Sequence, residues 1–267
     1  MAKKTIIIAI LMLGIQNIIF ANEELVLSGI YQGENIYVMN PFGESGAGFC
    51  IYEIMVNGQI STDEINSNAF EIDLSMYGFD IGYEIEIIIK YKDNCQPKIL
   101  NPEVINPKST FIVSSINVSK NGILTWTTTN ERGKLPFIVE QYKWNKWTQV
   151  ATIEGKGTNN LNKYSCKVDF NTGQNKFRVR QKDDTNKSRM SQEVSYKNIS
   201  APVTFTPGNG QKTSDFITFS AETNYEIFDY YGKLELKGKN NKVSIKKLEK
   251  GTYFINYDNK TETFIKK

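Results

Sequence analysis

The sequence predicts an all-β protein built from tandem β-sandwich domains. Beta-branched and aromatic residues dominate its apolar set, which includes 14 Tyr and 15 Phe, and such residues favour strands. Apolar and polar residues alternate over many short runs, as in half-buried strands, and turn-forming residues separate these runs. The 267 residues suffice for two or three domains of ~100–150 residues.

Charge and composition exclude several classes of function. Lys and Arg total 32 against 29 Asp and Glu, and without Lys3 and Lys4, which lie in the leader described next, the net charge is +1. Nucleic-acid partners are not expected, because clustered positive charge supplies most of that affinity. Histidine is absent, which removes Ser-His-Asp and Cys-His catalysis, His-ligated metals and a His-based pH switch.

Residues 1–21 have the layout of a secretory signal peptide. Two lysines precede an almost wholly apolar run from Ile6 to Phe20, and the chain turns polar after Ala21, the expected cleavage point. A membrane anchor is the alternative, but about 20 apolar residues are needed to span a bilayer and Gln16-Asn17 interrupts this run. We therefore expect an exported mature chain with no transmembrane segment.

Residues 22–108 are predicted to form the first β-sandwich domain. In residues 70–74 apolar side chains alternate with acids, and residues 81–90 do the same. Asn57-Gly58 is a dipeptide typical of a two-residue hairpin turn. The prolines of Asn101-Pro102 and Asn106-Pro107 then interrupt the strand pattern, which places the boundary near residue 108.

Two pairs of acids in this domain, Glu71/Asp73 and Glu84/Glu86, have the spacing that puts both carboxylates on one face of a strand. Catalytic carboxylates are one interpretation. A solvated outer face is favoured, because the opposite face is apolar. The serines lie in turns without a nucleophile-elbow glycine pattern. We therefore expect a protein that is not an enzyme, with no catalytic, cofactor-binding or metal-binding residues.

Three cysteines are present in the sequence. Cys166 shares a predicted strand face with apolar neighbours and is expected to be a small core residue. In an exported protein Cys50 and Cys95 are candidates for a disulfide. Two separate buried thiols remain the alternative, because spacing alone does not determine geometry.

Residues 109–200 are predicted to form a second sandwich. Seven strands are expected in fewer than ninety residues, a count typical of this architecture. Leu124 and Trp126 share one face and should fill the core. The predicted strands are 111–118, 123–128, 137–142, 147–153, 163–170, 177–182 and 194–196.

The middle segment resembles the fibronectin type III-like modules of exported Bacteroidetes proteins. The matching residues are 124–131, 137–141, Trp147, 155–158 and 177–183. The resemblance implies a scaffold or binding module.

An aromatic and basic cluster lies around the turn predicted at Asn145-Lys146. Trp147 occupies the position that the fibronectin-like module usually buries. Tyr142 and Trp144 are candidates for an exposed surface that binds carbohydrate or protein. The basic row formed by Arg178, Arg180, Lys182 and Arg189 is interpreted as a solvated strand face.

Residues 201–267 form a third, smaller unit in which strands are predicted at 216–221, 225–229, 242–245 and 252–257. Its pattern, Asp229-x-x-Gly232, then Leu248-x-x-Gly251-x-Tyr253, then a basic end at Lys266-Lys267, resembles the C-terminal sorting domain of the type IX secretion system. Gly232 is expected in a turn with positive φ, and Leu248 is expected to fill the core before a turn at Gly251. The usual Tyr-Pro-Asn-Pro opening is missing. A third plain β-domain is the alternative.

The whole arrangement resembles PorA-type accessory proteins that carry the sorting domain. The supporting stretches are 29–38, 40–41, 48–50, 56–58, 69–74 and 95–104. The resemblance implies a non-enzymatic accessory or signalling protein, exported through the periplasm to the outer membrane surface or extracellular space. Its expected partners are the type IX machinery in the outer membrane, with other envelope proteins and surface polysaccharide as further candidates. A surface adhesin and an unrecognised hydrolase are the alternatives.

Overall fold

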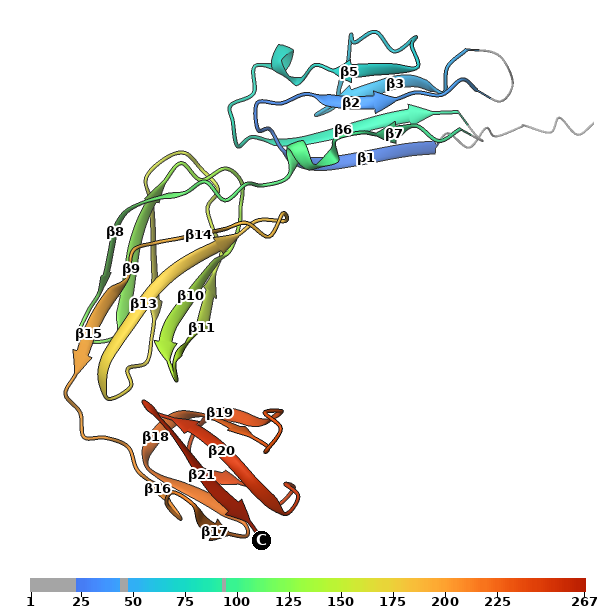
Figure 1. Cartoon of the computed structure of the whole chain (residues 1–267). Coiled ribbons are helices and arrows are strands. Elements are labelled where there is room, and N and C mark those ends of the chain that lie inside the picture. The colour runs from blue at the N-terminus through green and yellow to red at the C-terminus, as the bar shows by residue number, and fades with distance from the viewer. Residues whose placement is uncertain (1–22, 44–47, 93–94) are drawn as a thin grey trace, which may run out of the picture. The chain divides into compact units, whose positions relative to one another are not determined.

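A computed structural model describes residues 23–43, 48–92 and 95–267 (Figure 1). These residues form strands β1 to β21 and two short 3-10 helices, so the predicted all-β class is confirmed. The described chain folds into two compact units. The first contains the described residues up to Ser28, Glu34–Gly78 and Ile85–Val104; the second contains Gly29–Gly33, Phe79–Glu84 and Ile105–Lys267. The predicted signal peptide lies outside the described residues.

The N-terminal domain consists of two antiparallel sheets, one with the strand order β1-β6-β3-β4 and one with the order β5-β2-β7. Alternate residues of both sheets are buried, among them Ile36, Ile54, Ile72 and Ile87, each at most 2% exposed. The elements are β1 (Glu23–Ile30), β2 (Ile36–Met39), β3 (Ile51–Val56), β4 (Gln59–Ile60), β5 (Ala69–Ile72), η1 (Leu74–Tyr77), β6 (Glu84–Tyr91), β7 (Lys98–Ile99) and η2 (Pro102–Ile105).

Two details of this domain test the sequence pattern. Asn57 and Gly58 both have positive φ and join β3 to β4, as predicted for a two-residue hairpin. The strand expected over 81–90 begins only at Glu84, and Tyr83 is 52% exposed instead of buried. The ring of Tyr83 stacks on Phe79 at a centroid distance of 5.1 Å, so alternation alone placed the strand start too early.

The middle module is a sandwich of two sheets, β12-β9-β8 and β11-β10-β13-β14, with β15 also paired to β13. Trp126 is 1% exposed and contacts Phe137 and Tyr164, so its predicted place in the core is confirmed. The free thiol of Cys166 is only partly buried and packs at the edge of this core. The strands are β8 (Ile112–Val118), β9 (Ile123–Thr129), β10 (Phe137–Lys143), β11 (Lys146–Ile153), β12 (Asn162–Lys167), β13 (Gly173–Lys182), β14 (Ser188–Met190) and β15 (Val194–Asn198).

The β10–β11 turn differs by one residue from its prediction. Trp144 and Asn145 occupy it, with φ of 54° and 60°, because the register pairs Lys143 with Lys146. An Asn tolerates this conformation well, whereas a Trp adopts it rarely.

The C-terminal module is a six-stranded sheet folded on itself, in the order β16-β18-β20-β21-β17 with β19 paired to β18. Ile227, Ile255 and Phe264 are fully buried in its core. Two predicted strands merge into one long strand that bends at a register shift between Thr218 and Thr223. The strands are β16 (Phe205–Thr206), β17 (Gln211–Thr213), β18 (Phe216–Phe228), β19 (Leu234–Ser244), β20 (Gly251–Tyr257) and β21 (Lys260–Lys266). No helix in the part of the chain that the structure describes is long and apolar enough to cross a membrane.

Candidate functional site

The β18–β19 turn is built by the first half of the sorting pattern. The carboxylate of Asp229 accepts backbone hydrogen bonds from Tyr231 at 2.9 Å and Lys233 at 2.8 Å, and Gly232 closes the turn with φ 84°. The Gly232 N–H also donates to the Asp229 carbonyl at 3.1 Å. A side chain at Gly232 would be strained at this φ, so the predicted role of this glycine is confirmed. Asp229 and Gly232 therefore fix the shape of the turn.

The second half of the sorting pattern lies at the same end of the module. The Tyr253 hydroxyl donates to the Glu249 carbonyl at 3.0 Å and so ties the β19–β20 connection to β20. Leu248 is partly buried against the core. Gly251 was expected in a turn, but it opens β20 and pairs with Lys266. The basic C-terminus, Lys266-Lys267, thus adjoins this end by strand pairing.

Between these two connections lies a cleft of about 380 Å³. Its lining includes three lysines and three acids: Lys233, Lys247, Lys250, Asp229, Glu235 and Glu249. The Lys233 ammonium pairs with Glu235 at 2.7 Å, and this hydrogen bond raises the pKa of Lys233. Burial, followed by the nearby carboxylates, raises the pKa of Tyr253.

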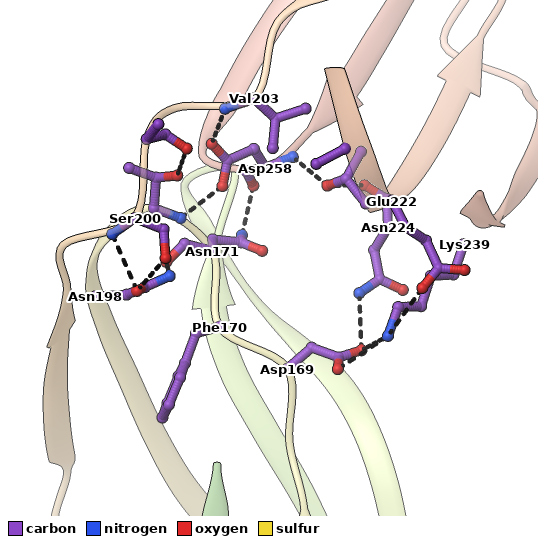
Figure 2. A pocket seen from close by; sticks show the side chains of 14 residues that line it. Asp169, Phe170, Asn171, Asn198, Ser200, Val203, Glu222, Asn224, Lys239 and Asp258 are labelled. Carbon is purple, nitrogen blue, oxygen red and sulfur yellow. Dashed lines mark hydrogen bonds and ion pairs between the residues drawn. The ribbon is translucent and has the colours of Figure 1, made fainter. Parts of the chain in front are cut away.

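The turn of the β20–β21 hairpin lies at the end of the hairpin opposite Gly251 and contacts the middle module (Figure 2). Asp258 is 2% exposed and has φ 47°. Its carboxylate accepts the backbone N–H of Thr172 at 2.6 Å and that of Val203 at 3.2 Å. Its carbonyl accepts the indole N–H of Trp144 at 3.0 Å and the side-chain amide of Asn171. One residue of the tail thus connects the middle module and the segment that follows it.

An ion pair borders the same junction. Asp169 lies 2.9 Å from the ammonium of Lys239 and accepts a hydrogen bond from Asn224 at 3.3 Å (Figure 2). Burial alone would raise the pKa of Asp169, but these hydrogen bonds hold it below the ordinary value. The cavity beside them measures about 240 Å³ and is lined mainly by polar residues. The dense pairing indicates that this cavity belongs to a structural joint.

The two predicted ligand-binding aromatic residues are placed in different environments. Tyr142 is 42% exposed, and its ring meets Trp147 edge-on at a centroid distance of 5.4 Å. The guanidinium of Arg178 lies over the ring of Trp147, 4.1 Å from its centroid. Trp144 was expected to face solvent, but it bonds to Asp258 inside the second unit. The two residues therefore do not form one open binding surface.

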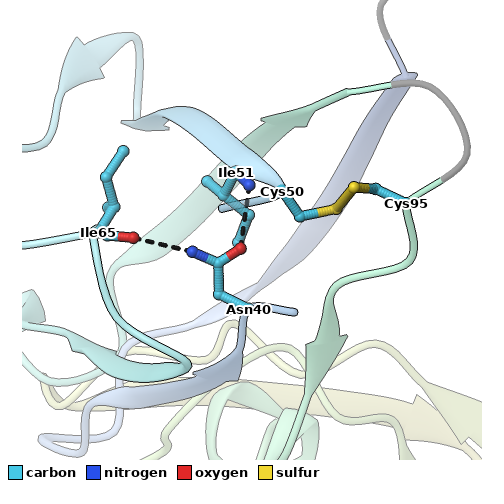
Figure 3. The surroundings of a disulfide bond; sticks show 5 residues. All are labelled: Asn40, Cys50, Ile51, Ile65 and Cys95. Atoms are coloured by element: carbon cyan, nitrogen blue, oxygen red, sulfur yellow. Dashed lines mark hydrogen bonds between the residues drawn. A yellow bond between two sulfur atoms is a disulfide. The ribbon is translucent and has the colours of Figure 1, made fainter. Parts of the chain in front are cut away.

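Cys50 and Cys95 form a disulfide in the N-terminal domain, with their Cα atoms 5.7 Å apart (Figure 3). Asn40 supports this region. It is fully buried, its side-chain oxygen accepts the Ile51 N–H at 3.0 Å, and its amide donates to the Ile65 carbonyl at 2.8 Å. The disulfide therefore joins the start of β3, which the side chain of Asn40 also holds, to the segment that contains Cys95.

An apolar face is exposed on the β5-β2-β7 sheet. Tyr37, Met39 and Leu100 point outward from β2 and the end of β7, and each is 47–48% exposed. They lie side by side, because the Leu100 N–H donates to the Tyr37 carbonyl at 2.9 Å. Exposed apolar residues that cluster in this way are typical of interaction surfaces.

Sequence reasoning missed two features of these sites. The tyrosines inside Asp229-x-x-Gly232 were passed over as variable positions, although the motif holds the turn that presents them. Asp258 was also missed, and its only local signal is the Asp-Asn pair between two strands. Among the described residues, no group of three or more Cys, Asp or Glu side chains is arranged to hold a metal ion.

Comparison with known proteins assigns the tail. Residues 207–267 match the family model described as the secretion system C-terminal sorting domain. No curated protein matches the sequence significantly.

Three multi-domain chains are among the solved structures that match this chain. A tetra-tandem repeat from the extending region of a large adhesion protein has 11% identity and a TM-score of 0.28, with 92% of this chain and 74% of that chain covered. The chicken CNTN1 FN1–FN3 domains have 12% identity and a TM-score of 0.24, with 90% and 98% covered. The central fibronectin-III array of RIM-binding protein has 12% identity and a TM-score of 0.19, with 87% and 95% covered. Identities and TM-scores this low say nothing about a shared function.

The family match and the sorting pattern coincide on the same residues. The chain therefore ends in a type IX C-terminal sorting domain, and the protein is exported by that secretion system to the cell surface or the extracellular space.

Proposed function

We propose that this protein is a non-enzymatic envelope or cell-surface protein that acts by binding other proteins, as an accessory or signalling component of the type IX pathway. The observation that carries the binding role is the exposed apolar face of Tyr37, Met39 and Leu100 in the N-terminal domain. The resemblance of the whole arrangement to PorA-type accessory proteins supports a role within the pathway.

The buried acids of the middle module are occupied by contacts within the fold, which supports a scaffold role for this module. Glu131 is 1% exposed, and its oxygens accept hydrogen bonds from Thr128, Tyr164 and the Gly157 N–H. Such a carboxylate is held by the fold and has little capacity left for a substrate. Glu140, 5% exposed, is likewise clamped by two arginines. These acids stabilise a scaffold.

Deletion of the gene tests the accessory role. We expect the deletion strain to export fewer of the other sorting-domain proteins, measured as their amount outside the cell relative to the amount inside. The wild-type chain should restore export, whereas a Tyr37→Asp/Leu100→Asp chain should not, because charges disrupt an apolar contact. Both positions are about half exposed, so the variant should still fold. Normal export in the deletion strain would refute the accessory role.

The proposed route runs through the periplasm and then across the outer membrane. A chain that ends at Ser200 lacks the sorting domain and should accumulate in the periplasm. The same location is expected for the full chain in cells without a type IX channel. Recovery of the truncated chain outside the cell in wild-type amounts would contradict this route.

Adhesion to carbohydrate or peptide is the second candidate, and the exposure of Tyr142 beside Trp147 favours it. Retention of the chain on surface polysaccharide that is lost in Tyr142→Ala would support adhesion. Equal retention of both chains would remove this candidate surface.

A further inference from the structure

Two tyrosines protrude from the β18–β19 turn of the tail. Tyr230 is 71% exposed and Tyr231 is 91% exposed, the largest values for any aromatic side chain in the described residues. Their rings meet edge-on at a centroid distance of 5.9 Å, so the pair has a defined arrangement. Exposed aromatic side chains on a rigid support are typical of residues that dominate binding energy in protein interfaces.

Hydrogen bonds within the turn hold the backbone that carries this pair. The Asp229 carboxylate bonds to the backbone of Tyr231 and Lys233, and the Asp229 N–H donates to the Lys233 carbonyl at 3.0 Å. These bonds fix the backbone of the turn. Asp229 and Gly232 therefore form a rigid turn, and this turn presents the side chains of Tyr230 and Tyr231.

The surface next to the pair carries both signs of charge, with four lysines against three acids once Lys266 is added to the residues that line the cleft. In the described chain Lys233 is paired with Glu235, whereas Lys247 and Lys250 make no ion pair. Lys266 adjoins the same end through its pairing with Gly251. Across residues 207–267 there are 11 lysines against 8 acids. A partner with an acidic rim would complement this charge.

We infer that Tyr230 and Tyr231 are the residues through which the export machinery binds the tail. The partner is a protein that offers apolar pockets to the two rings and acidic side chains to Lys247 and Lys250. This inference rests on the proposed route through the type IX channel. It adds which surface of the tail the export machinery recognises. The partner binds the open end of the module, where the cleft lies.

The test uses the full chain in cells with and without the type IX channel. We expect Tyr230→Ser/Tyr231→Ser to lower the amount outside the cell at least tenfold and to trap the chain inside. The matched control, Tyr52→Ser/Tyr83→Ser, replaces two other exposed tyrosines, at 39% and 52%, and should be exported normally. Lys247→Glu/Lys250→Glu tests the acidic rim and should also reduce export. Unfolding curves of the purified wild-type and Tyr230→Ser/Tyr231→Ser chains should coincide, because both tyrosine side chains are largely exposed.

The outcomes separate this inference from the proposed route. If the wild-type chain leaves cells that lack the channel, the route itself fails. If the wild-type chain depends on the channel but the Tyr230→Ser/Tyr231→Ser chain is exported equally well, the tyrosine contact alone is refuted. If only the lysine reversal leaves export unchanged, the acidic rim is refuted. A lowered melting temperature of the tyrosine variant would assign the pair to folding and would also overturn the inference.

Discussion

Replacement of Asp258 by Asn tests how much a buried carboxylate contributes to the joint between the tail and the middle module. The substitution keeps the size of the side chain, and Asn tolerates the φ of 47° found here. It removes the charge and turns one of two acceptor oxygens into an amide donor. One of the two backbone N–H groups of Thr172 and Val203 then loses its acceptor.

The structure indicates which bond is lost and what its loss costs. The Thr172 bond is shorter, at 2.6 Å against 3.2 Å, so the remaining oxygen should stay with Thr172 and the new amide should face the Val203 N–H. A hydrogen bond to a charged group contributes about 1.5–3 kcal/mol. Water cannot easily replace it, because Asp258 is only 2% exposed. At about 1.4 kcal/mol per factor of ten, the opening equilibrium at Val203 should rise about 10- to 150-fold.

Hydrogen exchange at individual amides measures this effect directly. We expect the Val203 amide to lose protection in Asp258→Asn while core amides of both modules, such as Ile255, keep theirs. Asp169→Asn is the matched control, because the same change occurs at the same junction on a side chain that is 45% exposed. It should leave the Val203 amide protected. Unchanged exchange at both Val203 and Thr172 in Asp258→Asn would refute the role of this carboxylate.

Four further results are expected. Trp126→Ala should destabilise the middle module by about 3–5 kcal/mol in urea unfolding, because it empties a fully buried site. Mass mapping of envelope-purified protein should find Cys50 linked to Cys95, and reduction should cost about 3–5 kcal/mol for a separation of 45 residues. Deletion of 264–267 removes the buried ring of Phe264 and the strand that lies between β20 and β17, so circular dichroism should show an unfolded tail. The pKa of Asp169 is lowered from 3.8, so its ion pair should stabilise the fold fully above that value and lose its contribution as pH falls through the folded pKa, as carboxyl NMR titration can check.

The middle module was predictable because several of its strands have one apolar face. Phe177 and Val179 of β13 alternate with polar residues, Phe137 and Val139 occupy alternate positions of β10, and all four are fully buried. The family pattern added Gly232 and Tyr253 of the tail. In both cases the signal in the sequence is local, since a strand with alternating residues or a turn motif depends only on neighbouring residues.

The features that escaped prediction depend on residues far apart in the sequence. Most of β19 was missed because its run from Lys237 to Lys242 is polar on both faces, as expected of an exposed edge strand and unlike a half-buried one. The acids Glu131 and Glu140 were not recognised as buried, because most of their donors come from β12, β13 and a distant loop. Trp144 was expected in solvent, because the tail residue that accepts its N–H lies 114 positions away.

The two ends of the β20–β21 hairpin carry different chemistry, and the difference bears on how a sorting domain can work. At one end Asp258 is buried and all its acceptors are occupied by the middle module and the segment after it. At the other end, near Gly251, the cleft is open and Tyr231 is almost fully exposed. A receptor that binds the open end need not break the buried joint, because the full length of the hairpin lies between the open end and the joint. Export signal and cargo contact can therefore coexist in one folded chain, and a substitution such as Asp258→Asn should loosen the joint without removing the surface that the receptor contacts.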